Sequence, residues 1–333
     1  MLIFNTPKFL YQFSIISLLL MPISWAYMAL YLINYRLRAR KSLQNNKFSG
    51  SVICVGNIVL GGSGKTEICL AIGRFLAKQG ITYCYLTKGY GRRGRQDIFL
   101  PKNSQFDAEI CGDEACLLAK DADTAVYNDM QSFILSEIAS KYRVIITDDG
   151  LHNPSFHKDI KICTFDAKKL DGNGFFVPSG ALRAPFMLFK NKIDYLIFTN
   201  QVNINSEKCN KIKEKLGLKR YFTSKIEYQI PDLQKKYIAF SGLGINQKFF
   251  ESLEAVGVQV QRKVEFPDHY KYTDADLENM LKMLTKYNAD QLITTSKDFV
   301  KISAKYHKHL QILEIMHTLE QDLLESFVKK INL

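Results

Sequence analysis

With 333 residues, 47% of them hydrophobic, the chain is long enough for two domains with real cores. Its formal net charge of +12 suits polyanions such as nucleic acid, anionic lipid or phosphorylated substrates, and charge alone does not choose among them. The sequence has no zinc-finger pattern and no aromatic-rich RNA-binding pattern, so we expect no nucleic-acid partner. Seven scattered cysteines without a C-x-x-C pair argue against a disulfide scaffold and indicate reduced thiols in a cytosolic compartment.

An uncharged, mostly apolar run from Phe9 to Tyr35 comes first, and it is long enough to span a bilayer. Pro22 interrupts it, and the basic stretch RLRARK (36–41) follows it, which argues against a cleaved signal peptide. The positive-inside rule then places the remainder of the chain in the cytoplasm. We predict that residues 1–41 associate with the membrane, as a single span or as a helix or hairpin in the cytoplasmic leaflet; a hydrophobic helix packed on the soluble body is the alternative.

A glycine-rich turn, VLGGSGKTE, lies between a buried strand predicted over 51–58 and a mostly apolar helix that ends near Gly80. Strand, glycine-rich turn and helix in this order are typical of a phosphate-binding loop, because the turn amides and the helix N-terminus face an anion. Lys65 would reach the β- and γ-phosphates of a nucleotide, and the Thr66 hydroxyl would bind Mg²⁺. We predict nucleotide binding by the whole turn: Val59, Leu60, Gly61, Gly62, Ser63, Gly64, Lys65 and Thr66.

This turn departs from the common pattern G-x-x-x-x-G-K-[ST], which has glycine where Val59 stands. An unrelated glycine-rich turn is the alternative interpretation. A second predicted strand (82–89) and a Gly/Arg-rich loop follow, and then strands and helices alternate: a helix over 112–121, a strand over 122–128, a helix over 133–142, and strands over 142–150, 159–166 and 194–200. This alternation predicts a mostly parallel sheet with helices on both faces.

Asp148 and Asp149 end the apolar strand over 142–150. An acid at this position of a P-loop protein holds Mg²⁺ directly or through water, so we predict both as metal-site residues; a pair of solvated turn acids is the alternative.

Near residue 225 the pattern changes, and a new set of units begins: helices over 246–256, 274–287 and 318–331, with strands over 257–265, 291–295 and 310–315. We therefore expect two α/β/α lobes, a P-loop lobe over 42–225 and a smaller one over 226–333. A cleft between two such lobes is a usual place for a ligand.

Three further residues are ambiguous from the pattern alone. Asp113 in CGDEA fits a helix N-cap better than a chemical role. His269, in a loop with an acid and two tyrosines, could handle a proton, although a lone histidine favours a packed loop. Arg183, in the Gly/Pro-rich stretch 172–185, could fork onto a phosphate, although a surface arginine is commoner. TTSKDFVK (294–301) does not match the guanine-reading N-K-x-D pattern.

Taken together, these stretches resemble the lipid A 4′-kinase (tetraacyldisaccharide 4′-kinase) family, a family of membrane-associated P-loop kinases. The resemblance covers about residues 36 to 302, and its motifs occur in the family's order: VGNIVLGGSGKTE, TKGYGRR, CGDEA, ITDDGLH, GNGFFVPSGALRAP, AFSGLG, EFPDHYKY and TTSKDFVK. The family's own phosphate loop also lacks the first glycine.

The resemblance implies ATP- and Mg²⁺-dependent phosphorylation of the 4′-hydroxyl of a tetraacylated glucosamine disaccharide 1-phosphate, at the cytoplasmic face of the bacterial inner membrane. It implies that Asp113 is the catalytic base, that His269 pairs with it from the second lobe, and that Arg183 lies near the transferred phosphate or the disaccharide. Lys65, with the phosphate loop, would hold ATP. No obligatory protein partner is implied.

The chain departs from the family at several positions. Thr87-Lys88 stands for Ser-Arg, which keeps the charge and loses the bidentate geometry. Where the family has Asp-Asp-Gly-x-Gln-His, this chain has its histidine one position earlier, at His152, so the role of that histidine stays open. Ala184 replaces an acid, and Ala115 a proline.

Two other functions stay open from the residues alone. One is a membrane-associated P-loop ATPase that drives partner assembly or transport without a lipid acceptor. The other is a P-loop kinase or ligase acting on a soluble small molecule.

Overall fold

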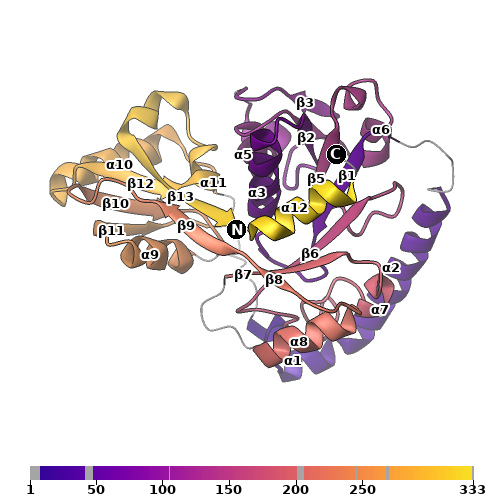
Figure 1. The fold of residues 1–333 in the computed structure, drawn as a ribbon. Coiled ribbons are helices and arrows are strands. Elements are labelled where there is room, and N and C mark those ends of the chain that lie inside the picture. Colours follow the sequence, from indigo (N-terminus) through magenta and orange to yellow (C-terminus); the bar gives the residue numbers. More distant parts are fainter. Residues whose placement is uncertain are drawn as a thin grey trace.

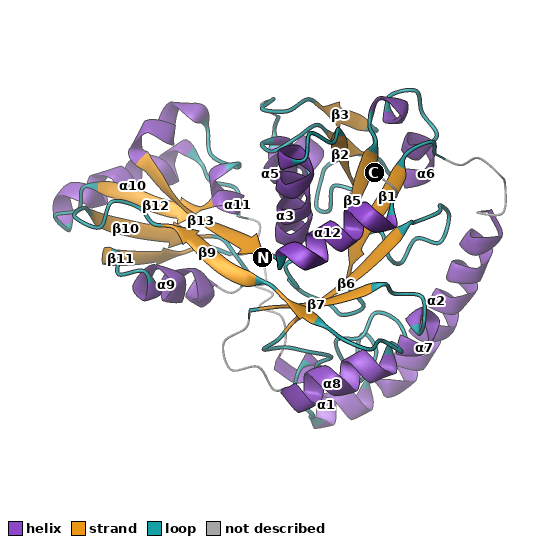
Figure 2. Ribbon diagram, in the orientation of Figure 1, coloured by secondary structure: helices purple, strands orange, loops and turns teal. Residues whose placement is uncertain are grey.

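The computed structural model describes residues 8–41, 48–104, 106–200, 206–244, 246–267 and 270–331. Two sheets organise these residues into two lobes that lie side by side (Figures 1 and 2). The larger sheet has eight strands in the order β3-β4-β2-β5-β1-β6-β7-β8, and the smaller has five in the order β11-β10-β12-β13-β9. The α/β architecture expected from the alternating pattern is therefore confirmed.

The strands of the larger sheet are parallel except for the antiparallel edge pair β3–β4. Their bounds are Ser51–Gly56 (β1), Tyr83–Thr87 (β2), Ile98–Leu100 (β3), Thr124–Val126 (β4), Val144–Asp148 (β5), Ile160–Asp166 (β6), Tyr195–Thr199 (β7) and Phe222–Thr223 (β8). The central strands are mostly apolar and mostly buried because helices cover both faces of the sheet.

Successive residues of β1 point to opposite faces, and each face has its own core. Ile53 and Val55 join the cluster beneath α3 (Lys65–Lys78), whereas Cys54 joins the cluster beneath α8 (Ser206–Lys215). The other helices of this lobe are short: Ala108–Cys111 (α4), Asp113–Ala119 (α5), Met130–Ile134 (α6), Phe186–Phe189 (α7), and the 3₁₀ helix Ala139–Lys141 (η2). The core on both sides fixes β1, and so fixes the point from which the glycine-rich turn leaves the sheet.

The helix expected over 133–142 is shorter than the sequence pattern indicates. α6 ends at Ile134, and a separate 3₁₀ turn occupies residues 139–141. The Ser136 hydroxyl accepts a hydrogen bond from the Ala139 backbone N–H at 3.3 Å. Such a side-chain bond offers the backbone an alternative to the helical ladder, which explains the break.

In the smaller sheet the strands β10 (Lys236–Ser241), β11 (Gln259–Glu265), β12 (Gln291–Thr295) and β13 (Leu310–Thr318) are parallel, and β9 (Lys225–Gln229) pairs antiparallel with β13. The helices of this lobe are α9 (Asn246–Ala255), α10 (Asp274–Lys286) and α11 (Ser296–Phe299), with the 3₁₀ helix Ala304–His309 (η3).

The stretch 219–230 contributes a strand to each sheet: β8 joins the first sheet and β9 the second, so this stretch connects the two lobes.

The last helix, α12 (Gln321–Lys330), returns to the first lobe (Figure 1). Its residues Leu323, Leu324 and Phe327 lie in the same apolar cluster as Ile68 and Leu76 of α3. The end of the segment 226–333 therefore packs on the first lobe, because that lobe offers an apolar face next to α3.

The N-terminal region forms the 3₁₀ helix Lys8–Leu10 (η1) and the helices Ile15–Leu19 (α1) and Met21–Lys41 (α2), which run along the edge of the first lobe away from the second sheet (Figure 1). One side of α2 is tied to the body, since the Ser24 hydroxyl donates to the Phe176 carbonyl at 2.9 Å. Large apolar side chains of this region are exposed: Phe13, Ile15, Ile16, Leu18, Leu19, Ile23, Trp25, Leu30, Ile33 and Leu37. Among the described residues, none of the helices combines the length and apolar character that a bilayer span requires.

Candidate active site

The glycine-rich turn joins β1 to α3 at the carboxyl edge of the larger sheet. Gly64 occupies the N-cap position of α3 with φ +72°, and a side chain there would meet Thr199. Glycine is therefore required at this position, and the first N–H groups of α3 are left without a capping side chain. Val59, which stands where the common pattern has glycine, is only 4% exposed and packs in the core next to Leu182. Valine at 59 thus anchors the turn to the body.

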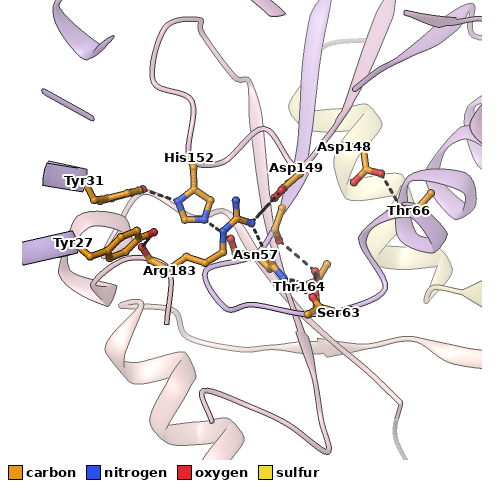
Figure 3. Close-up of polar contacts among 12 residues, drawn as sticks. Tyr27, Tyr31, Asn57, Ser63, Thr66, Asp148, Asp149, His152, Thr164 and Arg183 are labelled. Carbon is orange, nitrogen blue, oxygen red and sulfur yellow. Dashed lines mark hydrogen bonds and ion pairs between the residues drawn. The ribbon is translucent and has the colours of Figure 1, made fainter. Parts of the chain in front are cut away.

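Backbone and hydroxyl contacts hold the turn in place from two sides. The Leu60 N–H donates to the Ala181 carbonyl at 2.7 Å, which fixes the turn to the stretch 172–185. The Ser63 hydroxyl is buried between the Asn57 amide and the Thr164 hydroxyl, each at 2.9 Å (Figure 3). The turn is thus preformed before any ligand binds.

Thr66 and Asp148 meet at the start of α3. The Thr66 hydroxyl donates to Asp148 Oδ2 at 2.8 Å, and both side chains are buried (Figure 3). The other carboxylate oxygen of Asp148 is buried without a hydrogen-bond partner among the described residues. Burial, followed by the nearby charge of Glu114, raises the pKa of Asp148 well above its ordinary value. A buried carboxylate with an open oxygen beside a hydroxyl fits a hard cation.

Asp149, the next residue, faces Arg183 instead. Arg183 Nη1 lies 3.1 Å from each carboxylate oxygen of Asp149 and donates to Asn57 Oδ1 at 3.2 Å (Figure 3). Although burial favours the neutral acid, the charges of Lys65 and Arg183 outweigh it and lower the pKa of Asp149. The two aspartates predicted as one metal pair are therefore placed in different surroundings, one by a hydroxyl and one by a guanidinium.

His152 links α2 to the phosphate loop, a role that the sequence left open. Its Nε2 lies 2.7 Å from the Asn57 carbonyl, so this nitrogen is the donor, and its Nδ1 accepts from the Tyr31 hydroxyl at 2.6 Å (Figure 3). Burial, aided by the charge of Arg183, lowers the pKa of His152 to about 4, so the ring is neutral at pH 7. A further bond, from the Tyr27 hydroxyl to the Arg183 carbonyl at 3.3 Å, joins the same helix to the same site.

Asp113 is the first residue of α5 and not its cap. The cap position belongs to Gly112, whose φ of +92° lets the chain enter the helix. The N-cap interpretation of Asp113 is therefore wrong, and its carboxylate lies in the first turn of the helix, where the helix dipole favours negative charge. The side chain is 16% exposed, and Lys301 of the second lobe lies 3.5 Å from its Oδ2.

His269 lies outside the described residues. The loop on either side of it is described at Phe266 and from Tyr270 onward, and the ring centroids of Phe266 and Tyr270 lie 4.6 Å apart.

Lysines of the second lobe pair with acids of the first at several points that sequence reasoning did not find. Besides Lys301–Asp113 these pairs are Lys297–Glu67 (3.4 Å), Lys248–Asp166 (2.9 Å) and Lys271–Glu109. A cavity of about 330 Å³ also opens beside α3; its lining includes Glu67 and Arg74 of α3, Lys297, and Leu313 of β13. These ion pairs and the cavity all lie where the second lobe meets the phosphate-loop lobe.

Comparisons with known proteins agree on one family. The family model described as tetraacyldisaccharide-1-P 4′-kinase matches residues 16–332. The chain is 36% identical to a tetraacyldisaccharide 4′-kinase of Rickettsia canadensis over 89% of this chain and 87% of the relative, and 36% identical to one of Rickettsia bellii over 89% of each. A crystal structure of LpxK from Aquifex aeolicus in complex with ATP superposes with a TM-score of 0.75 at 26% identity, covering 95% of this chain and all of that one.

Proposed function

The chain belongs to the tetraacyldisaccharide-1-P 4′-kinase family, and on that premise we propose that it transfers the γ-phosphate of ATP to the 4′-hydroxyl of a tetraacylated glucosamine disaccharide 1-phosphate, a step of lipid A biosynthesis. The observation that carries the proposal is the Thr66–Asp148 hydrogen bond beside the preformed glycine-rich turn. It brings a phosphate-binding loop and a metal-binding acid to one point, as phosphoryl transfer needs.

ATP phosphates would lie against the N–H groups of the turn 59–64 and the start of α3, with Lys65 on the β- and γ-phosphates. Mg²⁺ fits beside them, because this ion is usually held by one or two carboxylates together with substrate phosphates. Thr66 and Asp148 would hold it, and Asp149 would complete the site through water or through Arg183. When bound, Mg²⁺ would neutralise charge on the β- and γ-phosphates.

The acceptor chemistry needs a base, which the first lobe would supply where it meets the second lobe. Asp113 would accept the proton of the 4′-hydroxyl as the hydroxyl oxygen bonds to the γ-phosphorus, and the bond from that phosphorus to the bridging oxygen breaks, so that ADP leaves with its electron pair. His269 would assist by pairing with Asp113, and Arg183 would contribute charge near the transferred group. Residues 42–225 would thus supply most of the nucleotide site, and the lobe within 226–333 would close it.

The N-terminal helices would rest on the cytoplasmic face of the inner membrane, where a four-chain lipid is found. Support comes from the exposed apolar side chains of residues 13–37, followed by Arg36, Arg38, Arg40 and Lys41, since apolar groups enter the headgroup boundary and basic groups attract anionic lipid.

A direct test is transfer of labelled γ-phosphate from ATP to the tetraacyl disaccharide 1-phosphate in detergent. Wild type should label the lipid, whereas Lys65→Ala should not. Lys78→Ala, an exposed lysine on the last turn of the same helix α3, is the matched control and should keep activity. ATP hydrolysis without labelled lipid would contradict the proposal and favour a membrane ATPase.

A further inference from the structure

The segment 294–301 (TTSKDFVK) ends β12 and forms α11, and two of its lysines, one helical turn apart, reach acids of the first lobe. Lys297 Nζ lies 3.4 Å from Glu67 Oε1 on the phosphate-loop helix, and Lys301 Nζ lies 3.5 Å from Asp113 Oδ2 at the start of α5. One short segment of the second lobe therefore contacts both the phosphate-binding helix and the acid proposed as the base.

Lys301 is held firmly within its own lobe. Its side chain is 7% exposed, and its ammonium lies 3.0 Å from Asp298 Oδ1. Asp298 is itself fully buried, and its other oxygen accepts from the Gly242 N–H at 3.1 Å and the Thr295 hydroxyl at 2.8 Å. The position of the Lys301 ammonium is thus set by the backbone and side chains of the second lobe.

A lysine ammonium has three donors and no acceptor, so it can serve two carboxylates at once. Lys301 donates to Asp298 on its own side and lies within ion-pair distance of Asp113 on the other. Because both side chains are largely buried, this ion pair favours one direction of the Asp113 carboxylate. It also makes the position of Asp113 depend on how the lobes meet.

We propose that Lys301 is a positioning residue for phosphoryl transfer, which aligns the Asp113 carboxylate with the acceptor hydroxyl and ties that alignment to the contact between the lobes. This proposal rests on the proposed function, in which Asp113 is the base. Lys301 would not touch ATP or the lipid; it would act through Asp113.

The test measures kcat, KM for ATP and nucleotide affinity for Lys301→Met and Lys301→Arg. Because a small misplacement of a reacting group can cost about 10²-fold in rate, Lys301→Met should lower kcat by about that factor. KM and the nucleotide dissociation constant should stay within about threefold, since the phosphate loop is untouched. Lys301→Arg, which keeps the charge, should recover most of the rate.

Two measurements separate this role from a structural one. Lys301→Met leaves the Asp298 carboxylate buried without the Lys301 ammonium. Thermal unfolding is therefore recorded for Lys301→Met and for the double variant Asp298→Asn/Lys301→Met, which removes both charges. Positioning predicts that the double variant has the same low kcat even where its melting temperature recovers. A return of kcat together with the melting temperature would overturn the proposal.

A double-mutant cycle with Asp113→Asn completes the test. In the Asp113→Asn background, Lys301→Met should change the remaining rate by less than about twofold, because the group it positions is gone. Lys297→Met, which removes the pair with Glu67, should act additively with Asp113→Asn. An inactive Asp113→Asn variant together with a fully active Lys301→Met variant would overturn this inference alone, whereas a fully active Asp113→Asn variant would overturn the assignment of the base and this inference with it.

Discussion

The phosphate-loop side and the Asp113 side of the candidate site are assembled in different ways. On the first side, Thr66, Asp148, Asn57 and Arg183 contact residues of their own lobe through hydrogen bonds of 2.8–3.2 Å. On the second side, Asp113 is contacted by Lys301, which follows α11 in the other lobe. The difference teaches that the proposed nucleotide site is held by contacts within one lobe, whereas the proposed base is contacted from the other lobe.

The sharpest way to break this comparison is to remove one acid from each side. Asp148→Asn and Asp113→Asn should each lower the rate of transfer by about 10²–10³-fold, because in the proposed mechanism each carboxylate acts on the reacting phosphate or hydroxyl. Only Asp148→Asn should weaken binding of the Mg²⁺-nucleotide complex, measured by calorimetry with and without the ion. Equal loss of nucleotide binding in both variants would contradict a division of labour between the lobes.

Membrane binding should depend on the phosphate-loop lobe alone, since α2 is hydrogen-bonded to that lobe through Ser24, Tyr27 and Tyr31. Replacing the exposed Trp25, Leu30 and Ile33 by aspartate should lower partitioning onto vesicles with anionic lipid by about 10²-fold or more. Ile230→Asp, at an exposed apolar residue that follows β9 in the second lobe, is the control and should leave partitioning unchanged. Vesicle flotation measures both, and equal binding of the triple variant and wild type would refute the membrane role of α2.

The His152 contact predicts a pH dependence of stability that belongs to the first lobe. The pKa of His152 is about 4 in the fold, below its ordinary value, so the unfolded chain takes up the proton first as pH falls. The stability from the neutral ring is present above pH 6.5 and is lost as pH falls towards 4, by at most about 3 kcal/mol.

Denaturant unfolding in detergent, from pH 7 to 4, compares wild type with His152→Gln to isolate this contribution. Wild type should lose more stability than the variant over this window. The same pH slope in both proteins would show that the ring is not held neutral between Tyr31 and Asn57.

A smaller effect is expected for Arg183→Lys. Lysine keeps the positive charge near Asp149 but cannot contact Asp149 and Asn57 in the same planar arrangement, so kcat should fall by roughly tenfold, or about 1.4 kcal/mol. Nucleotide affinity should change little. A wild-type kcat would mean that charge alone is what Arg183 contributes.

The sequence predicted the parts of the fold and of the candidate site that depend on residues close together in the chain. The strand, turn and helix around residues 51–78 form one continuous stretch, and Asp148 ends an apolar strand that could be recognised by itself, so their meeting follows from the order of a parallel sheet. The site assignments made by resemblance remain predictions, and His269 among them lies outside the described residues.

The lysines that cross between lobes could not be predicted in this way. Lys301 and Asp113 are far apart in the chain, and no local sequence pattern indicates which acid a lysine will contact once the two lobes pack together. The same holds for His152, which lies in a turn after β5 and whose partners Tyr31 and Asn57 come from α2 and from the turn after β1. Such contacts depend on how separate elements pack, and a hydrophobic pattern specifies which face is buried but not which side chains meet at its border.

The central claim is that one lobe binds ATP and the other helps to position the base for a lipid hydroxyl. The most direct test is a rapid-quench measurement of γ-phosphate transfer to the tetraacyl disaccharide 1-phosphate by wild type and Asp113→Asn. Nucleotide binding is measured in parallel for both proteins. The account predicts a labelled lipid with wild type and almost none with the variant, at equal nucleotide affinity. Lipid labelled at the wild-type rate by Asp113→Asn, or ATP consumed by wild type without labelled lipid, would contradict it.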